Sequence, residues 1–197
     1  MSSIIDFDLV CSFVEQGLIK HHSLYKHLRC KAEFLESIYS DALIDAGYGS
    51  DWKPNYGHKI GKDITIDLGE RLSGKAGRVV YKGSKLEFSS SRCTSYETIE
   101  EMVEFLSQPH QDYIMCCAGN IPEWERGLRK YYFIVIEASK LKYSDVDWVP
   151  TYSKNNKLTG WKCSSPDFSA KIKKSMSNQL WVTAHSSLYD FYKEIVI

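Results

Sequence analysis

The chain has 197 residues, of which 43% are apolar and 25% are charged, and its 25 basic side chains balance 25 acidic ones. This length and composition predict one domain with a substantial core and exclude a disordered chain. No run of about 18 uncharged apolar residues occurs, so no membrane span is expected. The first residues, MSSIIDFDLVC, contain two acids and lack the basic region of a secretory signal, so we expect a cytoplasmic protein.

Cysteine and histidine spacing does not favour a metal site or a disulfide framework. The six cysteines form no C-x-x-C pair, and a zinc site needs paired ligands. Three histidines, His21, His22 and His27, have no acid at ligand spacing. We therefore predict that the cysteines are buried free thiols.

The N-terminal third of the chain shows helical periodicity. Residues 4–17 have apolar side chains on one face and are predicted to form a helix that ends at Gly17, followed by a basic loop. Residues 31–46 repeat the pattern, and Gly47 is predicted to end that helix. The stretch 47–63 contains four glycines and one proline, which is typical of a loop.

Beyond residue 63 the period changes to that of strands. Residues 63–67 alternate polar and apolar side chains, and three further strands are expected at 71–75, 78–81 and 85–89. Residues 98–106 predict a short helix capped by Ser95 or Thr98. The later segments are predicted as strands at 112–118, 131–137 (central), 168–172 and 179–182, a loop-rich stretch at 151–166 and a final helix around 188–195. This order predicts an α/β or α+β fold with a mixed sheet.

The stretch from Asp63 to Lys75 contains the residues with the clearest chemistry. Side chains alternate along a strand, so Ser73 and Lys75 share one face of theirs. If the strands 63–67 and 71–75 pair, a carboxylate and an ammonium group meet beside a glycine-rich loop. A carboxylate binds Mg²⁺, and a neighbouring lysine can orient a water molecule, which are the groups that phosphodiester hydrolysis needs.

The order of these segments resembles the PD-(D/E)xK nuclease superfamily, which includes the type II restriction endonucleases. KAEFLESIY (31–39) resembles the first core helix, with Glu33 at its acidic position. GHKIGKD (57–63) resembles the approach to the metal-binding strand, and SGK (73–75) lies where the acid-x-lysine motif belongs. The stretches 86–94 and 175–181 also resemble restriction-endonuclease-like sequences.

The resemblance implies a restriction-endonuclease-like mixed β-sheet flanked by helices, in one nuclease-like domain over 1–197. Residues 1–30 would be a helical extension, 31–150 the catalytic core and 151–197 a DNA-contacting part. The implied activity is Mg²⁺-dependent, site-specific cleavage of double-stranded DNA. Cutting both strands of a short site needs two active sites, so a homodimer is expected. The catalytic residues would be Asp63, Lys75 and Glu33.

One position departs from the family pattern. The acid expected two residues before the lysine is Ser73, and a serine hydroxyl is a weak, neutral metal ligand. Three acids are candidates for the second carboxylate at the metal: Glu33, Glu70 and Glu87.

Two polar stretches are candidates for contacts with DNA. Hydroxyl groups bind phosphate oxygens, arginine can pair with guanine, and amide side chains can pair with adenine. The predicted DNA-binding residues are Ser90, Ser91, Arg92, Lys173, Asn178 and Gln179.

Other interpretations remain open from the sequence. Asp63 can belong to the solvent face of an edge strand, Lys75 to a turn, and Glu33 to an exposed helix surface. The missing acid at Ser73 favours a non-catalytic nucleic-acid-binding module on a decayed nuclease fold. A nuclease acting on branched DNA or RNA is a third possibility.

Overall fold

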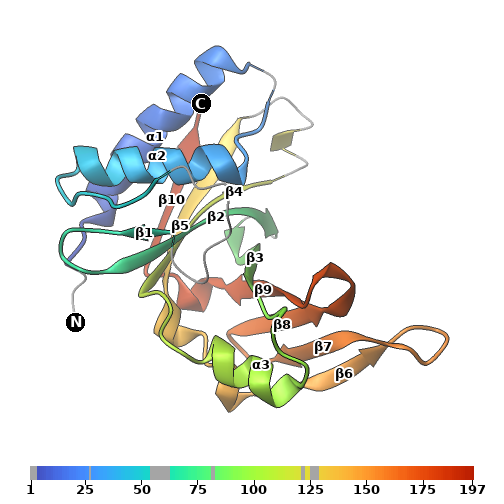
Figure 1. Ribbon diagram of the computed structural model, residues 1–197. Helices are drawn as coiled ribbons and strands as arrows, with labels where there is room; N and C mark the ends of the chain where they lie inside the picture. Colours follow the sequence, from blue (N-terminus) through green and yellow to red (C-terminus); the bar gives the residue numbers. More distant parts are fainter. Residues whose placement is uncertain (1–3, 27, 54–62, 81–82, 121–122, 125–128) are drawn as a thin grey trace.

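The computed structural model describes residues 4–197 except 27, 54–62, 81–82, 121–122 and 125–128. The glycine-rich loop 57–62 and His27, both considered above, lie outside the described residues. The described part forms a mixed ten-stranded sheet with three α-helices (Figure 1). The helices are α1 (Phe7–Leu24), α2 (Ala32–Asp45) and α3 (Ile99–Leu106); the strands are β1 (Ile64–Thr65), β2 (Arg71–Val80), β3 (Lys85–Arg92), β4 (Tyr113–Gly119), β5 (Lys130–Glu137), β6 (Val149–Tyr152), β7 (Leu158–Ser164), β8 (Phe168–Lys173), β9 (Gln179–His185) and β10 (Phe191–Val196).

The strands follow the order β10-β5-β4-β2-β3-β9-β8-β7-β6, and β1 pairs with the start of β2. All pairs are antiparallel except β2 with β4, which run parallel. Parallel neighbours need a crossover connection. Between β2 and β4 the chain passes through β3 and then α3. The prediction of a mixed α and β fold is thus confirmed.

Two hydrophobic cores lie on opposite faces of this sheet. On β4, Met115 and Cys117 belong to the core that contains α1 and α2, whereas Ile114 and Cys116 belong to the core that contains α3. Figure 1 shows α1 and α2 at the top and α3 at the bottom. Strands β4 and β5 are buried on both faces, which explains why residues 131–137 show no alternation.

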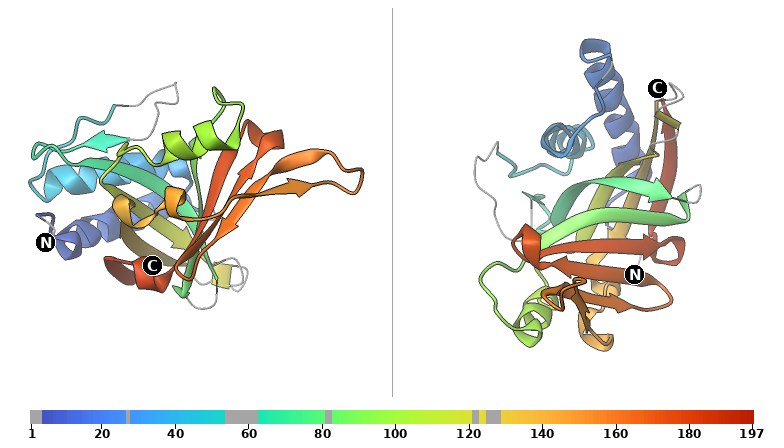
Figure 2. Two further views of the ribbon diagram at one scale, coloured as in Figure 1. Left: turned by 90° about the horizontal axis from the view of Figure 1, so that it is seen from below. Right: turned by 90° about the vertical axis from the view of Figure 1, so that its right-hand side faces the viewer.

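Strands β6–β9, here called the C-terminal wing, bury one face only. Trp161, Ile172 and Leu180 pack into the core with α3. No described residue of β3 or of the wing belongs to the core formed by α1 and α2. Figure 2 shows the wing extending away from the helical half of the molecule. One face of the wing therefore remains open in the described structure.

The first helix is longer than the sequence predicted. Asp6 caps it through the N–H of Leu9, and the helix continues past Gly17, so that His21 and His22 are helical rather than part of a basic loop. Gly17 serves helix packing, because a Cβ atom there would lie 2.7 Å from Cγ2 of Ile38 on α2. The prediction that Gly17 ends the helix was wrong for this reason.

The predicted strands 71–75 and 78–81 belong to one continuous strand, β2, which ends at Val80; residue 81 lies outside the described residues. The glycines inside this strand do not form turns; they leave room for side chains that pack closely against the strand. A Cβ atom at Gly74 would lie 2.7 Å from the Tyr39 ring, and one at Gly77 would lie 2.6 Å from Sγ of Cys116.

Two predictions for the C-terminal third were wrong. Residues 151–166 include much of the β6–β7 hairpin, whose polar composition reflects its solvent-facing side. Residues 191–196 form an edge strand paired with β5 instead of a helix. The apolar residues at 188, 191, 192 and 195 have helical spacing, but Phe191 and Ile195 also share one face of a strand, and pairing with β5 decides between the two.

Predictions for the cap of α3 and for the cysteines are confirmed. Thr98, rather than Ser95, caps α3 and forms a capping box with Glu101. All six cysteines are free and buried. No helix within the described ranges has the length and apolar character needed to cross a bilayer.

The environment of the buried His22 leads us to expect that the stability of the protein depends on pH. Nε2 of His22 lies 2.9 Å from the hydroxyl of Tyr131, which already accepts the N–H of Cys30 at 3.0 Å and so can donate to a neutral imidazole. Burial, followed by the charges of His21 and Arg129, lowers the pKa of His22 from 6.5 to about 4. Between these values the unfolded chain binds the proton and the folded chain does not, so stability falls as the pH drops.

We expect the free energy of unfolding of the wild type to lose about 2 kcal/mol more than that of His22→Gln between pH 7 and pH 5. Urea unfolding at both pH values measures this difference. Equal losses in the two proteins would show that His22 does not titrate in this range.

Candidate active site

Strands β2 and β3 pair along only part of their length, and a cleft lies between their unpaired halves. The pairing runs from Gly77 opposite Phe88 to Val80 opposite Lys85. Beyond it, residues 73–76 of β2 and 89–92 of β3 line a pocket of about 490 Å³, with Glu36 of α2 and Asp63 beside them. This pocket, here called the cleft, contains six of the residues that the sequence singled out: Asp63, Lys75, Ser90, Ser91, Arg92 and Gln179.

Asp63 lies just before β1, where its N–H donates to the carbonyl of Leu72 at 3.0 Å. Its Oδ2 atom accepts hydrogen bonds from Ser73 Oγ (3.0 Å), the N–H of Gly74 (2.7 Å) and Lys75 Nζ (3.2 Å). Within the described residues, no donor contacts Oδ1. The predicted meeting of Asp63 and Lys75 is therefore present in the structure, and both side chains remain about one-fifth exposed.

A second acid faces this pair from helix α2. Glu36 lines the cleft, and its Cγ lies 3.6 Å from the position that a Cβ atom would occupy on Gly74. Burial, and next the negative charge of Asp63, raise the pKa of Glu36, while Lys75 opposes the shift. Glu36 therefore lines the same cleft as Asp63 and Lys75.

The buried phenol of Tyr39 connects α2 to the strand that carries the lysine. Its hydroxyl donates to the carbonyl of Lys75 at 2.8 Å and accepts the N–H of Cys117 at 2.6 Å. The hydroxyl thus bridges β2 and β4, and Gly74 leaves room for the ring. Tyr39 follows Glu36 by three residues, so it anchors the turn of the helix that bears the acid.

The three acids considered from sequence as the second metal ligand lie elsewhere. Glu33 is exposed on α2, one turn before Glu36, and does not line the cleft. Glu87 pairs with Arg78 on the closed part of the β2–β3 hairpin. Glu70 lines a neighbouring pocket, where its buried Oε2 has no hydrogen-bond partner among the described residues. At the motif position, Ser73 is fully buried and donates to Asp63.

Gln179 and Asn178, both predicted to contact DNA bases, bind backbone carbonyls in and just after β3 instead. Between Ser89–Trp181 and Arg92–Gln179 the pairing advances three residues on β3 and two on β9, which defines a bulge. The Gln179 amide donates to the carbonyls of Ser90 and Ser91 and accepts from Arg92 Nε at 2.9 Å. Adenine recognition by Gln179 is not supported, because these contacts use both ends of its amide.

Asn178 also has a structural contact. Its Nδ2 donates to the carbonyls of Cys93 and Tyr96, both at 3.3 Å, and its backbone has a positive φ of 51°. Ser90, Ser91 and Arg92 line the cleft. Lys173 does not line the cleft but lies next to it on β8, exposed and opposite Gln179.

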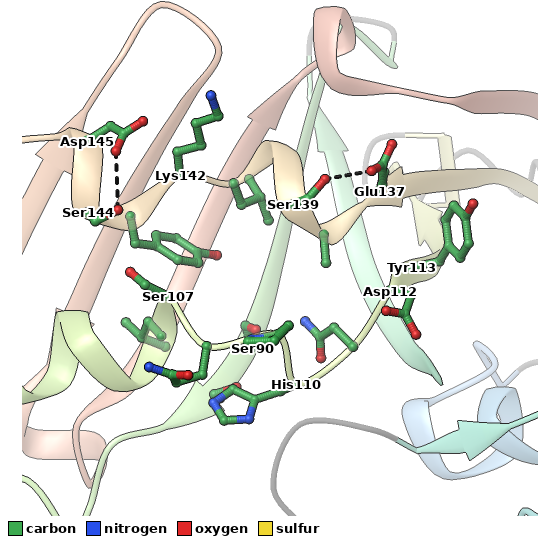
Figure 3. A pocket seen from close by; sticks show the side chains of 18 of the residues that line it. Ser90, Ser107, His110, Asp112, Tyr113, Glu137, Ser139, Lys142, Ser144 and Asp145 are labelled. Carbon is green, nitrogen blue, oxygen red and sulfur yellow. Dashed lines mark hydrogen bonds between the residues drawn. The ribbon is translucent and has the colours of Figure 1, made fainter. Parts of the chain in front are cut away.

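A second pocket of about 550 Å³ adjoins the cleft and shares Ser90, Ser91 and Gln111 with it. Figure 3 shows this pocket, with Ser139 bonded to Glu137 and Ser144 bonded to Asp145. The carboxylate of Asp112 is bound by Arg71 at 2.9 Å. The pocket is lined by four acids and one lysine, Lys142, which makes it less suited to a phosphate than the cleft.

The cleft has a donor set that fits a hard divalent cation. Among the described residues, no cluster of three or more His, Cys, Asp or Glu side chains forms a metal site. Mg²⁺ keeps several water molecules and commonly uses only one or two carboxylates, so Asp63 and Glu36 suffice in number.

Sequence reasoning missed Glu36 although the signal was present. On α2 the buried residues Leu35, Tyr39, Ala42 and Leu43 define the inward stripe. Glu36 adjoins that stripe, whereas Glu33 lies at the exposed start of the helix. A helical projection of KAEFLESIY would therefore have favoured Glu36.

No family model matches this chain, and no curated protein matches it.

Proposed function

We propose that the protein is a Mg²⁺-dependent endonuclease that hydrolyses phosphodiester bonds of double-stranded DNA on a restriction-endonuclease-like fold. The observation that carries the proposal is the convergence of Asp63, Lys75 and Glu36 in the cleft between β2 and β3. The order of a helix with an acid, a short strand after an aspartate, and a strand with a lysine agrees with the resemblance noted above.

Each of the three side chains has a part in the proposed hydrolysis. The carboxylates of Asp63 and Glu36 would hold Mg²⁺, which neutralises phosphate charge and lowers the pKa of a bound water. Lys75 Nζ, 3.2 Å from Asp63, would orient the attacking water and stabilise the charge that develops on the phosphate. The attacking water would add to phosphorus and release a proton to solvent, one P–O ester bond would break, and the departing oxygen would take a proton from a solvent water.

The wall of the cleft supplies groups suited to the DNA backbone. Ser90 and Ser91 lie on the bulge, where hydroxyl and N–H groups can bind phosphate oxygens, and Arg92 is exposed at the edge. A homodimer would present two such clefts to the two strands of a symmetric site.

Digestion of plasmid DNA tests the proposal. With Mg²⁺ we expect discrete fragments, and with EDTA no cleavage, because the metal is required for charge neutralisation. Parallel reactions with RNA and with branched DNA define the substrate. A folded protein that cuts none of these at any Mg²⁺ concentration would contradict the assignment.

The second candidate is a nucleic-acid-binding module without catalytic activity. Ser73 favours it, because this position lacks the acid of the nuclease motif. Gel retardation of DNA without cleavage in Mg²⁺ would support this alternative.

A further inference from the structure

Four basic side chains lie on the open face of the sheet beside the cleft. Strand register places Lys162 opposite Lys171, Lys171 opposite Trp181, and Trp181 opposite Ser89. Paired residues point to the same face of the sheet, so these four residues form a first row across it. Lys173 and Gln179 lie two residues from Lys171 and Trp181 on their strands and share that face. They pair with each other, and Gln179 pairs with Arg92, which gives a second row. Arg92, Lys162, Lys171 and Lys173 are here called the basic face; all four are exposed.

The charge of this face is not neutralised by acids within it. The two rows contain no aspartate or glutamate. The next row along β3 contains Glu87, which already pairs with Arg78. Lys173 Nζ lies 4.8 Å from the centre of the Trp181 ring, so the indole supports this cation on the sheet. The surface therefore presents four cations to any ligand that approaches it.

The basic face is continuous with the cleft. Arg92 and Gln179 line the cleft and also stand in the second row. From β3 to β7 the sheet crosses three strand spacings, or about 14 Å. This distance matches about four base-pair steps of B-DNA at 3.4 Å each.

We propose that the basic face binds the phosphate backbone of duplex DNA next to the phosphate held in the cleft. The inference rests on the proposed function, and it adds Lys162 and Lys171 to the DNA-contacting residues. A DNA backbone is the occupant that the surface favours, because regularly spaced cations on a flat sheet next to a phosphodiesterase site complement a regular polyanion. The wing would thus set the path of the duplex, whereas the cleft would perform the chemistry.

Binding in EDTA tests the surface without cleavage. The affinity for a short fluorescein-labelled duplex is measured by fluorescence anisotropy between about 50 and 200 mM KCl. For Lys162→Gln/Lys171→Gln we expect binding at least about tenfold weaker and a log–log salt slope shallower by about 1.8, since each lost phosphate contact removes about 0.9. Lys20→Gln/Lys26→Gln, which removes the same charge from exposed positions in and beyond α1, is expected to keep the wild-type slope.

The outcomes separate this proposal from the catalytic one. If the Lys162/Lys171 variant keeps the wild-type affinity for the duplex and the wild-type salt slope, the basic face does not bind DNA, even if the enzyme cuts DNA. Loss of binding in that variant would support it even if the wild type proves inactive. Binding of the wild type to phosphatidylserine vesicles, with no binding to the duplex, would overturn it in favour of a membrane surface. Circular dichroism of each variant confirms that these exposed substitutions leave the fold intact.

Discussion

Replacing Lys75 by alanine is expected to reduce Mg²⁺-dependent DNA cleavage by about 100-fold or more, because loss of one donor that stabilises transition-state charge costs a factor of about 10²–10³. Lys75 Nζ donates to the same Asp63 oxygen as Ser73 and Gly74, so its ammonium lies where a metal-bound water would need orientation. Initial cleavage rates of a supercoiled plasmid measure the effect. Asp63→Asn should be at least as damaging, since it removes the anionic metal ligand.

The control for this prediction is Lys142→Ala, which removes the lysine of the adjoining pocket shown in Figure 3. We expect its cleavage rate to remain within about twofold of wild type, because surface substitutions away from a site are usually tolerated. Activity lost in Lys142→Ala and retained in Lys75→Ala would move the active site to the adjoining pocket. Thermal unfolding of each variant excludes misfolding as the cause.

The second large effect is expected at Glu36. Glu36→Gln should weaken Mg²⁺ binding and lower cleavage by about 10–100-fold, because it removes one of two carboxylates without changing the side chain's size. Glu33→Gln is the matched control on the same helix, and it is expected to behave like wild type because Glu33 is exposed outside the cleft.

Mg²⁺ titrations of the cleavage rate distinguish the two glutamates. For Glu36→Gln the concentration giving half-maximal rate should rise, and excess Mg²⁺ should recover part of the activity. If Glu33→Gln shows this shift and Glu36→Gln does not, the sequence-based choice of Glu33 would be right and the placement of Glu36 as a ligand wrong.

Local sequence patterns correctly predicted those helices and strands whose form does not depend on contacts with distant parts of the chain. Helix α3 has a capping box and an apolar stripe, and β5 is a continuous apolar run, so each was predicted within a few residues. The continuation of α1 past Gly17 depended on the side chain of Ile38 on another helix. The strand β10 depended on the exposed edge of β5, which no local pattern of residues 188–195 contains.

The candidate site divides in the same way. Alternation along strands and a short hairpin were enough to predict that Asp63 and Lys75 meet. The positions of Gln179 and Asn178 could not be predicted, because both amides bind carbonyls that the pairing of β3 with β9 brings near them. The partners lie more than eighty residues away in sequence: Ser90 and Ser91 of the bulge for Gln179, and Cys93 and Tyr96 after β3 for Asn178. A polar side chain in an unpaired stretch can serve a base or a carbonyl, and only the tertiary structure shows which.

The hydroxyl of Tyr39, which bridges β2 and β4, bears on which residues of this protein can vary during evolution. This hydroxyl is bound to the backbone on both sides, to Lys75 and to Cys117, so the spacing between the helical acid and the strand lysine is fixed from the interior. Exposed residues around the cleft can therefore be exchanged without altering that spacing. Selection could in this way vary the surface that meets the substrate while the geometry of hydrolysis stays constant.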